Sequence, residues 1–149
     1  VAVAKYWNNK RCPLVVVEAM EALGGAGYIE DSVLPRLYRE APLNGIWEGS
    51  GNVICLDILR TFEKVPEVRD QLTDELGPAS DAFIASVAQA QSGDARRIVG
   101  ELARAWQKQL LENYGLAGAD EHLSAMQGGA FGEDFPKHAT AQRLATSLI

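Results

Sequence analysis

Apolar residues recur at helical spacing in several segments of this sequence, and Gly or Pro separates one segment from the next. The clearest segment repeats an apolar side chain every four residues, at Ile98, Leu102, Trp106 and Leu110. Asp94 precedes this segment as a candidate N-cap, and Gly115 follows it as a C-terminal stop. No segment alternates apolar and polar residues as a half-buried strand would. The sequence therefore predicts an all-α fold, an antiparallel helical bundle.

Four more segments have the composition or spacing of helices: residues 3–23, 48–63, 66–76 and 78–91. Pro13 should kink the first helix or divide it, because proline removes the hydrogen bond to residue 9. Glycines at 24, 25 and 27 should then end that helix. Between the two Pro-containing boundaries we expect a short helix or turn over 34–40, followed by irregular backbone over 41–47.

The last part of the chain has a weaker pattern. It supports a short helix over 120–126, a glycine-rich loop over 128–132 and a final helix over 137–148. Across the whole chain, the apolar positions expected to be mostly buried are Leu23, Val53, Leu56, Leu59, Leu102 and Trp106.

A chain of 149 residues can bury a core of its own without disulfides or a structural metal. Cys12 and Cys55 are isolated from each other and from any His at metal-ligand spacing, so we interpret them as reduced, mostly buried thiols of a cytoplasmic protein. No metal is expected. No apolar run approaches the roughly 20 residues that a membrane span requires. Val1 opens the chain without a Met or a charged signal-peptide flank, so we expect a piece of a longer protein.

The charge balance argues against a broad phosphate-binding surface. The chain carries 14 basic and 20 acidic residues, net -6; residues 1–60 hold 6 and 7 of them, and residues 61–149 hold 8 and 13. A local basic patch stays open as an alternative, and it would consist of Arg96, Arg97, Arg104 and Lys108. The same residues could equally be a solvated helix face. We expect duplex DNA to bind weakly or not at all.

Several catalytic motifs are missing from the sequence: the glycine-rich phosphate loops, H-E-x-x-H, and the Glu-x-x-His pairs of di-iron bundles. His122 and His138 lie in the least patterned region, so we interpret them as exposed histidines.

Two segments remain as candidates. L-G-G-A-G-Y at 23–28 permits close backbone approach by another group, although a helix C-cap followed by a tight turn explains it as well. P-L-N-G-I-W-E-G-S-G-N-V at 42–53 sets Glu48 beside a Trp and a Gly near the start of a helix. A carboxylate buried beside an aromatic ring becomes a stronger base, and glycine leaves room for a substrate. The alternative is a helix-entry Glu that interacts favourably with the helix dipole.

Two segments together resemble one family. They are E-A-M-E-A-L-G-G-A-G-Y at 18–28 and L-P-R-L-Y-R-E-A-P-L-N-G-I-W-E-G-S-G-N-V-I-C-L-D-I-L-R at 34–60. That family is the acyl-CoA dehydrogenases, in their C-terminal helical domain, and the resemblance is strongest to the AidB-like branch of adaptive-response, alkylation-induced flavoproteins. It covers about residues 2–62. We therefore divide the chain into a catalytic helical segment over 1–62 and a helical extension over 63–149 packed on it.

The resemblance implies an activity and a base. In this family a Glu removes the α-proton of an acyl-CoA thioester while the β-hydrogen leaves as hydride to N5 of FAD. By motif position Glu48 is that base, and Trp47 and Gly49 line the thioester site. Arg60 either points into the substrate pocket or forms a surface ion pair with Asp57.

The resemblance also implies FAD contacts. Ser50 and Asn52 stand where the family has a Thr and a Gln that contact FAD. Gly24 and Gly25 match glycines whose backbone lies against the FAD of a neighbouring subunit. Glu21 occupies the place where many members have a FAD-contacting Gln, which is a departure from the family pattern.

The family's other two domains are not in this sequence. We therefore expect the chain to be incomplete as an enzyme, to lack FAD on its own, and to act with the remaining domains in a homo-oligomer. Two further hypotheses stay open. The extension could be a nucleic-acid module, since AidB-like proteins are associated with DNA protection, or a purely structural layer for oligomerisation.

Overall fold

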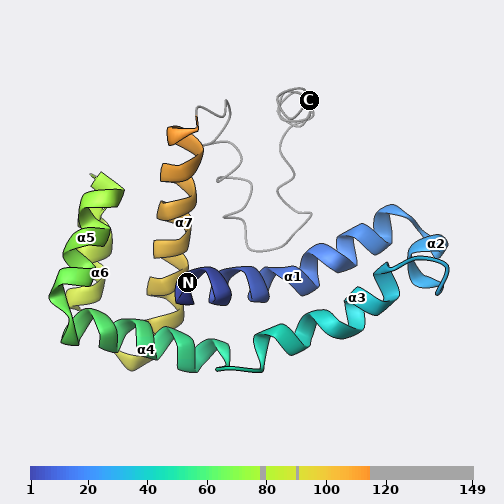
Figure 1. The fold of residues 1–149 in the computed structure, drawn as a ribbon, viewed down its shortest axis with the longest axis horizontal. Helices are drawn as coiled ribbons and strands as arrows, with labels where there is room; N and C mark the ends of the chain where they lie inside the picture. The colour runs from blue at the N-terminus through green and yellow to red at the C-terminus, as the bar shows by residue number, and fades with distance from the viewer. Residues whose placement is uncertain (78–79, 90, 115–149) are drawn as a thin grey trace. The chain divides into compact units, whose positions relative to one another are not determined.

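The computed structural model describes residues 1–77, 80–89 and 91–114, and every regular element among them is a helix (Figure 1). The elements are α1 (Ala2–Ala22), α2 (Gly25–Tyr28), α3 (Leu34–Glu40), the 3₁₀ helix η1 (Ala41–Gly45), α4 (Gly51–Lys64), α5 (Pro66–Leu76), α6 (Ser80–Ala88), the 3₁₀ helix η3 (Ser92–Asp94) and α7 (Ala95–Asn113). These residues contain no strand, which confirms the all-α prediction. None of their helices is both long and apolar enough to cross a membrane.

The chain forms two compact units, Val1–Ala103 and Arg104–Ile149. The first unit holds α1 to α6 and the start of α7, and the second holds the end of α7. The division at residue 62 follows the family resemblance and stays a prediction. The elements predicted over 120–126, 128–132 and 137–148, with His122 and His138, lie outside the described residues.

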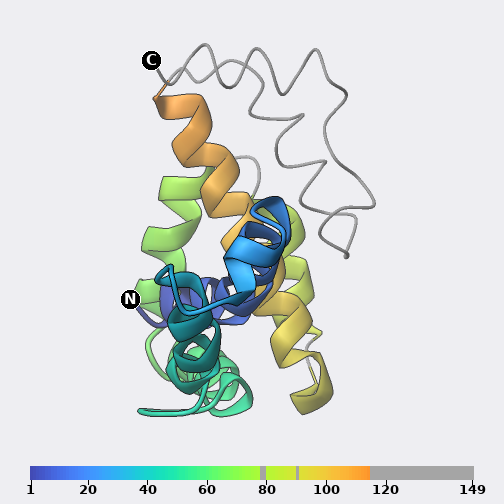
Figure 2. The same ribbon diagram turned by 90° about the vertical axis from the view of Figure 1, so that its right-hand side faces the viewer.

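In the first unit, α1 lies antiparallel to the segment that follows the α2 turn. The chain runs out along α1, reverses through α2, and returns along α1 through α3, η1 and α4 (Figure 1), an arrangement seen end-on in Figure 2. α1 is one continuous helix through Pro13. Its two halves run in different directions (Figure 1), so the predicted kink is present and the predicted division is not.

Glycine permits the reversal after α1. Gly24 has φ 59°, in the left-handed region that a side chain disfavours. Gly27 is buried against the end of α1, and a Cβ there would lie 2.8 Å from Met20 Cα and 2.9 Å from its carbonyl carbon. Because these neighbours are backbone atoms, α2 can approach α1 this closely only without a side chain at residue 27.

The apolar core of the first unit lies between α4, α5, α6 and the start of α7. The largest fully buried side chains of the described residues are Leu76, Ile98, Leu102, Val99 and Cys55. The rings of Phe62 and Phe83 join α4 to α6 in an edge-to-face contact, with centroids 5.7 Å apart. α1 contributes only Val16 to the buried apolar set.

Two of the six burial predictions are wrong. Leu59 and Leu102 are buried, and Leu56 and Trp106 are half-buried, but Leu23 is 55% exposed and Val53 is 49% exposed. Leu23 is the C-cap residue of α1 and follows its last turn. Val53 lies on the face of α4 opposite the buried residues, since at 100° per residue it shares a side with positions 57, 60 and 64.

Several predicted boundaries also move. Residues 41–45, expected to be irregular, form η1, which extends α3 directly. α4 begins at Gly51 with Ser50 as its N-cap, three residues later than expected. Pro66 occupies the first position of α5, where its missing N–H has no intrahelical partner to lose. α6 is shorter than the helix predicted over 78–91.

Candidate functional site

The turn at residues 46–50, between η1 and α4, carries four of the predicted site residues, Trp47, Glu48, Gly49 and Ser50. Glu48 has φ 52° and Gly49 has φ 100°, so two consecutive residues adopt left-handed backbone. A Cβ at Gly49 would also lie 3.3 Å from Ile54 Cγ1. Glu48 is the one described residue other than glycine with a positive φ. The turn therefore holds its carboxylate residue in a conformation that its side chain disfavours.

The Glu48 carboxylate is exposed, and it has neither a hydrogen bond nor an ion pair to another described residue. It lies two residues before the N-cap of α4, whereas the helix predicted over 48–63 would include it in the first turn. Trp47, which precedes it, is 56% exposed. The turn thus presents a carboxylate and an indole together at the surface of the described chain.

Side chains from α1 hold this turn. Lys5 Nζ donates hydrogen bonds to the main-chain carbonyls of Trp47 and Glu48, at 2.7 and 2.8 Å. One helical turn further along α1, Asn9 Nδ2 donates to the carbonyl of Asn44 at 2.7 Å. Neither α1 residue could be identified as part of the site from the sequence. Lys5 and Asn9 are spaced i, i+4, but α1 also carries Asn8, Lys10 and Arg11, so the spacing does not mark the pair or say what it faces.

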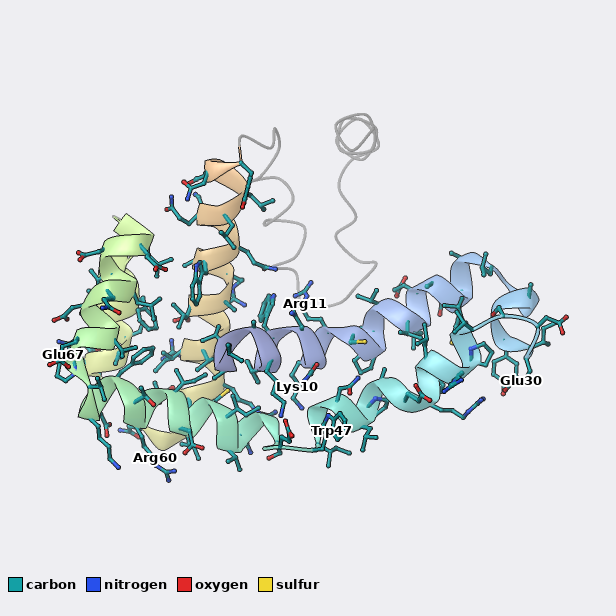
Figure 3. The ribbon with its side chains drawn as sticks, viewed as in Figure 1. Lys10, Arg11, Glu30, Trp47, Arg60 and Glu67 are labelled. Carbon is teal, nitrogen blue, oxygen red and sulfur yellow. The ribbon has the colours of Figure 1, made fainter. Side chains whose placement is uncertain are left out.

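The start of α4 packs closely on α1. A Cβ at Gly51 would lie 3.4 Å from the Tyr6 ring and 2.7 Å from Lys10 Cε, and Lys10 projects from α1 toward the start of α4 (Figure 3). Lys5, Asn9, Asn44 and Ile54 are among the residues that line a small hollow here. Its volume is about 10 Å³, which is room for one water molecule, so it is no substrate pocket.

Arg60 lies away from the turn. It is nine residues along α4 from Gly51, about 13 Å at 1.5 Å per residue. Its guanidinium Nη1 donates to Asp57 Oδ1 at 2.8 Å, and the side chain is 62% exposed. Arg60 projects from α4 on the side away from α1 (Figure 3). Of the two alternatives for Arg60, the described chain contains the ion pair with Asp57.

Gly24 and Gly25 lie at the other end of α1. The helix rises about 25 Å between Lys5, which contacts the turn, and Ala22, which ends α1. A Cβ at either glycine would meet nothing within 4 Å, so open space adjoins their backbone. The structure therefore brings residues 47–52 together and keeps Gly24 and Gly25 apart from them. Glu21 is exposed in the last turn of α1.

The side chains predicted to contact FAD are exposed and have polar atoms available to bind it. Ser50 is exposed and makes no side-chain cap bond to α4, and Asn52 is exposed in the first turn of that helix. Neither side chain has a hydrogen-bond partner among the described residues, so their polar atoms are free to bind a flavin edge. The open backbone at Gly24 and Gly25 likewise leaves room for a flat group from outside.

Other charged residues form pairs of their own. The guanidinium of Arg39 lies 2.6 Å from Glu30 Oε1, and this hydrogen bond lowers the pKa of the Glu30 carboxyl. In the predicted basic patch, Arg97 pairs with Asp94 at 3.4 Å and with Glu101 at 2.9 Å. Lys108 lies 3.7 Å from Glu112. These acidic neighbours reduce the positive field that a nucleic acid would meet.

Both cysteines are free thiols, as predicted. Cys12 is half-buried, and Cys55 is fully buried in α4. Burial raises the pKa of the Cys55 thiol, and the positive charge of Arg96 and a hydrogen bond with Tyr6 only partly oppose this rise. Residues 1–77, 80–89 and 91–114 contain no group of three metal-ligating side chains. Cys55 is therefore a neutral core residue.

Comparisons with known proteins found similarity in the first part of the chain. Residues 1–62 match the family model described as acyl-CoA dehydrogenase, C-terminal domain. AidB of Escherichia coli is 58% identical over 71 residues, which cover 48% of this chain and 13% of that protein. Acyl-CoA dehydrogenase family member 11 of Caenorhabditis elegans is 47% identical over 60 residues, 40% of this chain and 10% of that protein. The chain thus spans a small fraction of these relatives, and the resemblance seen in the sequence is confirmed.

Proposed function

Because residues 1–62 match the acyl-CoA dehydrogenase C-terminal domain, we propose that this chain is the C-terminal part of an FAD-dependent oxidoreductase that dehydrogenates an acyl-CoA thioester. Glu48 is the base that removes the α-proton. The observation that carries this proposal is the turn at 46–50. There a carboxylate with no partner among the described residues stands in left-handed backbone beside an exposed Trp47.

The turn suits proton abstraction for chemical reasons. A proton next to a thioester carbonyl is weakly acidic, so it needs an aligned carboxylate from which water is excluded. The Glu48 carboxylate is free to accept that proton, because it forms no ion pair within the described chain. Trp47 supplies apolar surface beside it, and by motif position Gly49 would line the thioester site.

FAD, when bound, supplies the acceptor for the hydride that leaves the β-carbon. Ser50 and Asn52 would bind it through their free polar atoms. Gly24 and Gly25 would lie against the FAD of a neighbouring copy, since about 25 Å of α1 separates them from the turn. The two groups of residues therefore serve two different flavin sites in a homo-oligomer.

The remaining domains of the protein would cover the apolar surface around the turn. Leu43, Ile46 and Trp47 are exposed at the turn and just before it, and Tyr28 and Val33 are exposed at the other end of α1, in and after α2. A surface this rich in apolar groups is typical of a face that packs on another domain or copy. We place the complete protein in the cytoplasm. The 149-residue chain alone should hold FAD loosely or not at all and show no turnover, because it supplies only part of the flavin site.

The test is a substitution in the complete protein. Glu48→Gln keeps the shape of the side chain and removes the base, so FAD content should be unchanged. Reduction of FAD by an acyl-CoA should slow by about two to four orders of magnitude, the usual contribution of a general base. The measurement is anaerobic flavin bleaching with a series of acyl-CoA chain lengths. If the Gln variant bleaches as fast as the wild type, Glu48 is a structural residue of the turn and the proposal fails.

A further inference from the structure

One ammonium group binds both peptide groups that flank the Cα of Glu48. The carbonyl of Trp47 belongs to the peptide before this Cα, and the carbonyl of Glu48 belongs to the peptide after it. Lys5 Nζ lies 2.7 Å from the first oxygen and 2.8 Å from the second. Hydrogen bonds from a charged donor are roughly twice as strong as those between neutral groups. Lys5 therefore restrains rotation on both sides of the Glu48 Cα.

The two bonds depend on the conformation of Glu48. In extended backbone, successive carbonyls point in opposite directions, so one ammonium could not reach both. At φ 52° the turn directs both oxygens toward α1. A residue with a Cβ disfavours this conformation, and Gly49 after it is left-handed as well. Without Lys5, the turn should relax toward more common conformations.

We propose that Lys5 is a positioning residue for Glu48: its ammonium, bonded to the carbonyls of Trp47 and Glu48, keeps the turn in the left-handed conformation that directs the carboxylate at the substrate. This inference rests on the proposed role of Glu48. Lys5 touches no reacting atom in this proposal and acts only through the backbone of the turn.

A nearby contact provides a comparison. Asn9 makes the same kind of bond from the same helix, but to the carbonyl of Asn44, four residues before Glu48. Lys10 carries the same charge as Lys5 and lies against the start of α4, yet it has no hydrogen bond to another described residue. A Lys10 variant therefore separates the effect of a nearby positive charge from the effect of the two bonds.

The experiment uses the complete FAD-loaded protein with three variants. Lys5→Met keeps the aliphatic stem and removes the donors, Lys5→Arg keeps a cationic donor, and Lys10→Met is the matched control. Hydrogen exchange followed by mass spectrometry on residues 46–50 reports the turn independently of activity. Anaerobic single-turnover bleaching with an acyl-CoA then gives the limiting rate constant and the half-saturation concentration separately.

We expect Lys5→Met to speed exchange at 46–50 and to lower the limiting rate constant about 10- to 100-fold, since a misplacement of about 1 Å can cost that much. The half-saturation concentration should change less than threefold. Lys5→Arg should recover most of the rate, and Lys10→Met should behave as the wild type. A purely structural role for Lys5 would lower thermal stability without this separation of rate from binding.

Three results would overturn the inference. The first is a wild-type bleaching rate in Lys5→Met, and the second is unchanged exchange at 46–50 in that variant. The third is an equal loss of rate in Lys10→Met, which would show that charge and not positioning matters. Glu48→Gln, measured in parallel, distinguishes the two proposals. If Glu48→Gln is slow and Lys5→Met is fast, only the role of Lys5 is lost; if Glu48→Gln is fast, both roles are lost.

Discussion

Replacing Glu48 with Gly should stabilise this chain while it removes the proposed base. Glu48 has φ 52°, and no hydrogen bond or ion pair joins its carboxylate to another described residue. The folded chain therefore accommodates a strained residue whose side chain forms no hydrogen bond or ion pair with the described residues. Such a residue is expected where the conformation serves function rather than stability.

The size of the effect follows from two opposing terms. Left-handed backbone costs a residue with a Cβ about 1–2 kcal/mol, and Gly avoids that cost. Gly also loses more conformational freedom on folding, which costs roughly 0.5–1 kcal/mol. The free energy of unfolding should therefore rise by about 0.5–1 kcal/mol in Glu48→Gly. For a chain of this size the melting temperature should rise by about 1–4 °C.

Urea unfolding followed by circular dichroism measures this difference, with Glu18→Gly as the control. Glu18 lies inside α1, where φ is helical, so Gly there should lower the free energy of unfolding by about 1 kcal/mol. A Glu48→Gly variant that is clearly less stable than the wild type would refute the reasoning. It would mean that the turn is not left-handed in solution, or that the side chain makes a stabilising contact.

Two other outcomes are expected. Gly27→Ala should destabilise the chain by about 1–3 kcal/mol, because its Cβ would lie 2.8 Å from Met20 Cα. Gly25→Ala should be neutral, because nothing lies within 4 Å of its Cβ position. Equal melting temperatures for the two variants would contradict the packing of α2 on α1. The hydrogen bond with Arg39 lowers the pKa of the Glu30 carboxyl in the folded chain. The stability that this pair contributes is therefore complete above the carboxyl's ordinary pKa of 4.5, and it is lost as the pH falls through the lowered pKa. Glu30→Gln should therefore be slightly less stable than the wild type in urea unfolding at pH 7, with the difference shrinking below pH 4.5; a difference that stays constant to pH 3 would exclude this linkage.

The sequence by itself determined the all-α class and most of the helices. The spacing of Ile98 and Leu102 and the position of Pro66 are local properties, and helix formation depends on contacts three and four residues apart. The grouping of Trp47, Glu48 and Gly49 is equally local, because neighbours in the chain stay neighbours in the fold. These features could be predicted because no distant part of the chain is needed to produce them.

Only the tertiary structure decided what each helix face contacts. Val53 is apolar and lies in a helix, yet it is exposed because the neighbours of α4 cover the opposite side. The left-handed backbone of Glu48 is held by Lys5, which is 43 residues away in the sequence. No local pattern encodes that bond, because it depends on α1 and the η1–α4 turn meeting after the chain has reversed through α2. The separation of Gly24 and Gly25 from the turn likewise follows from the length of α1 and not from any motif.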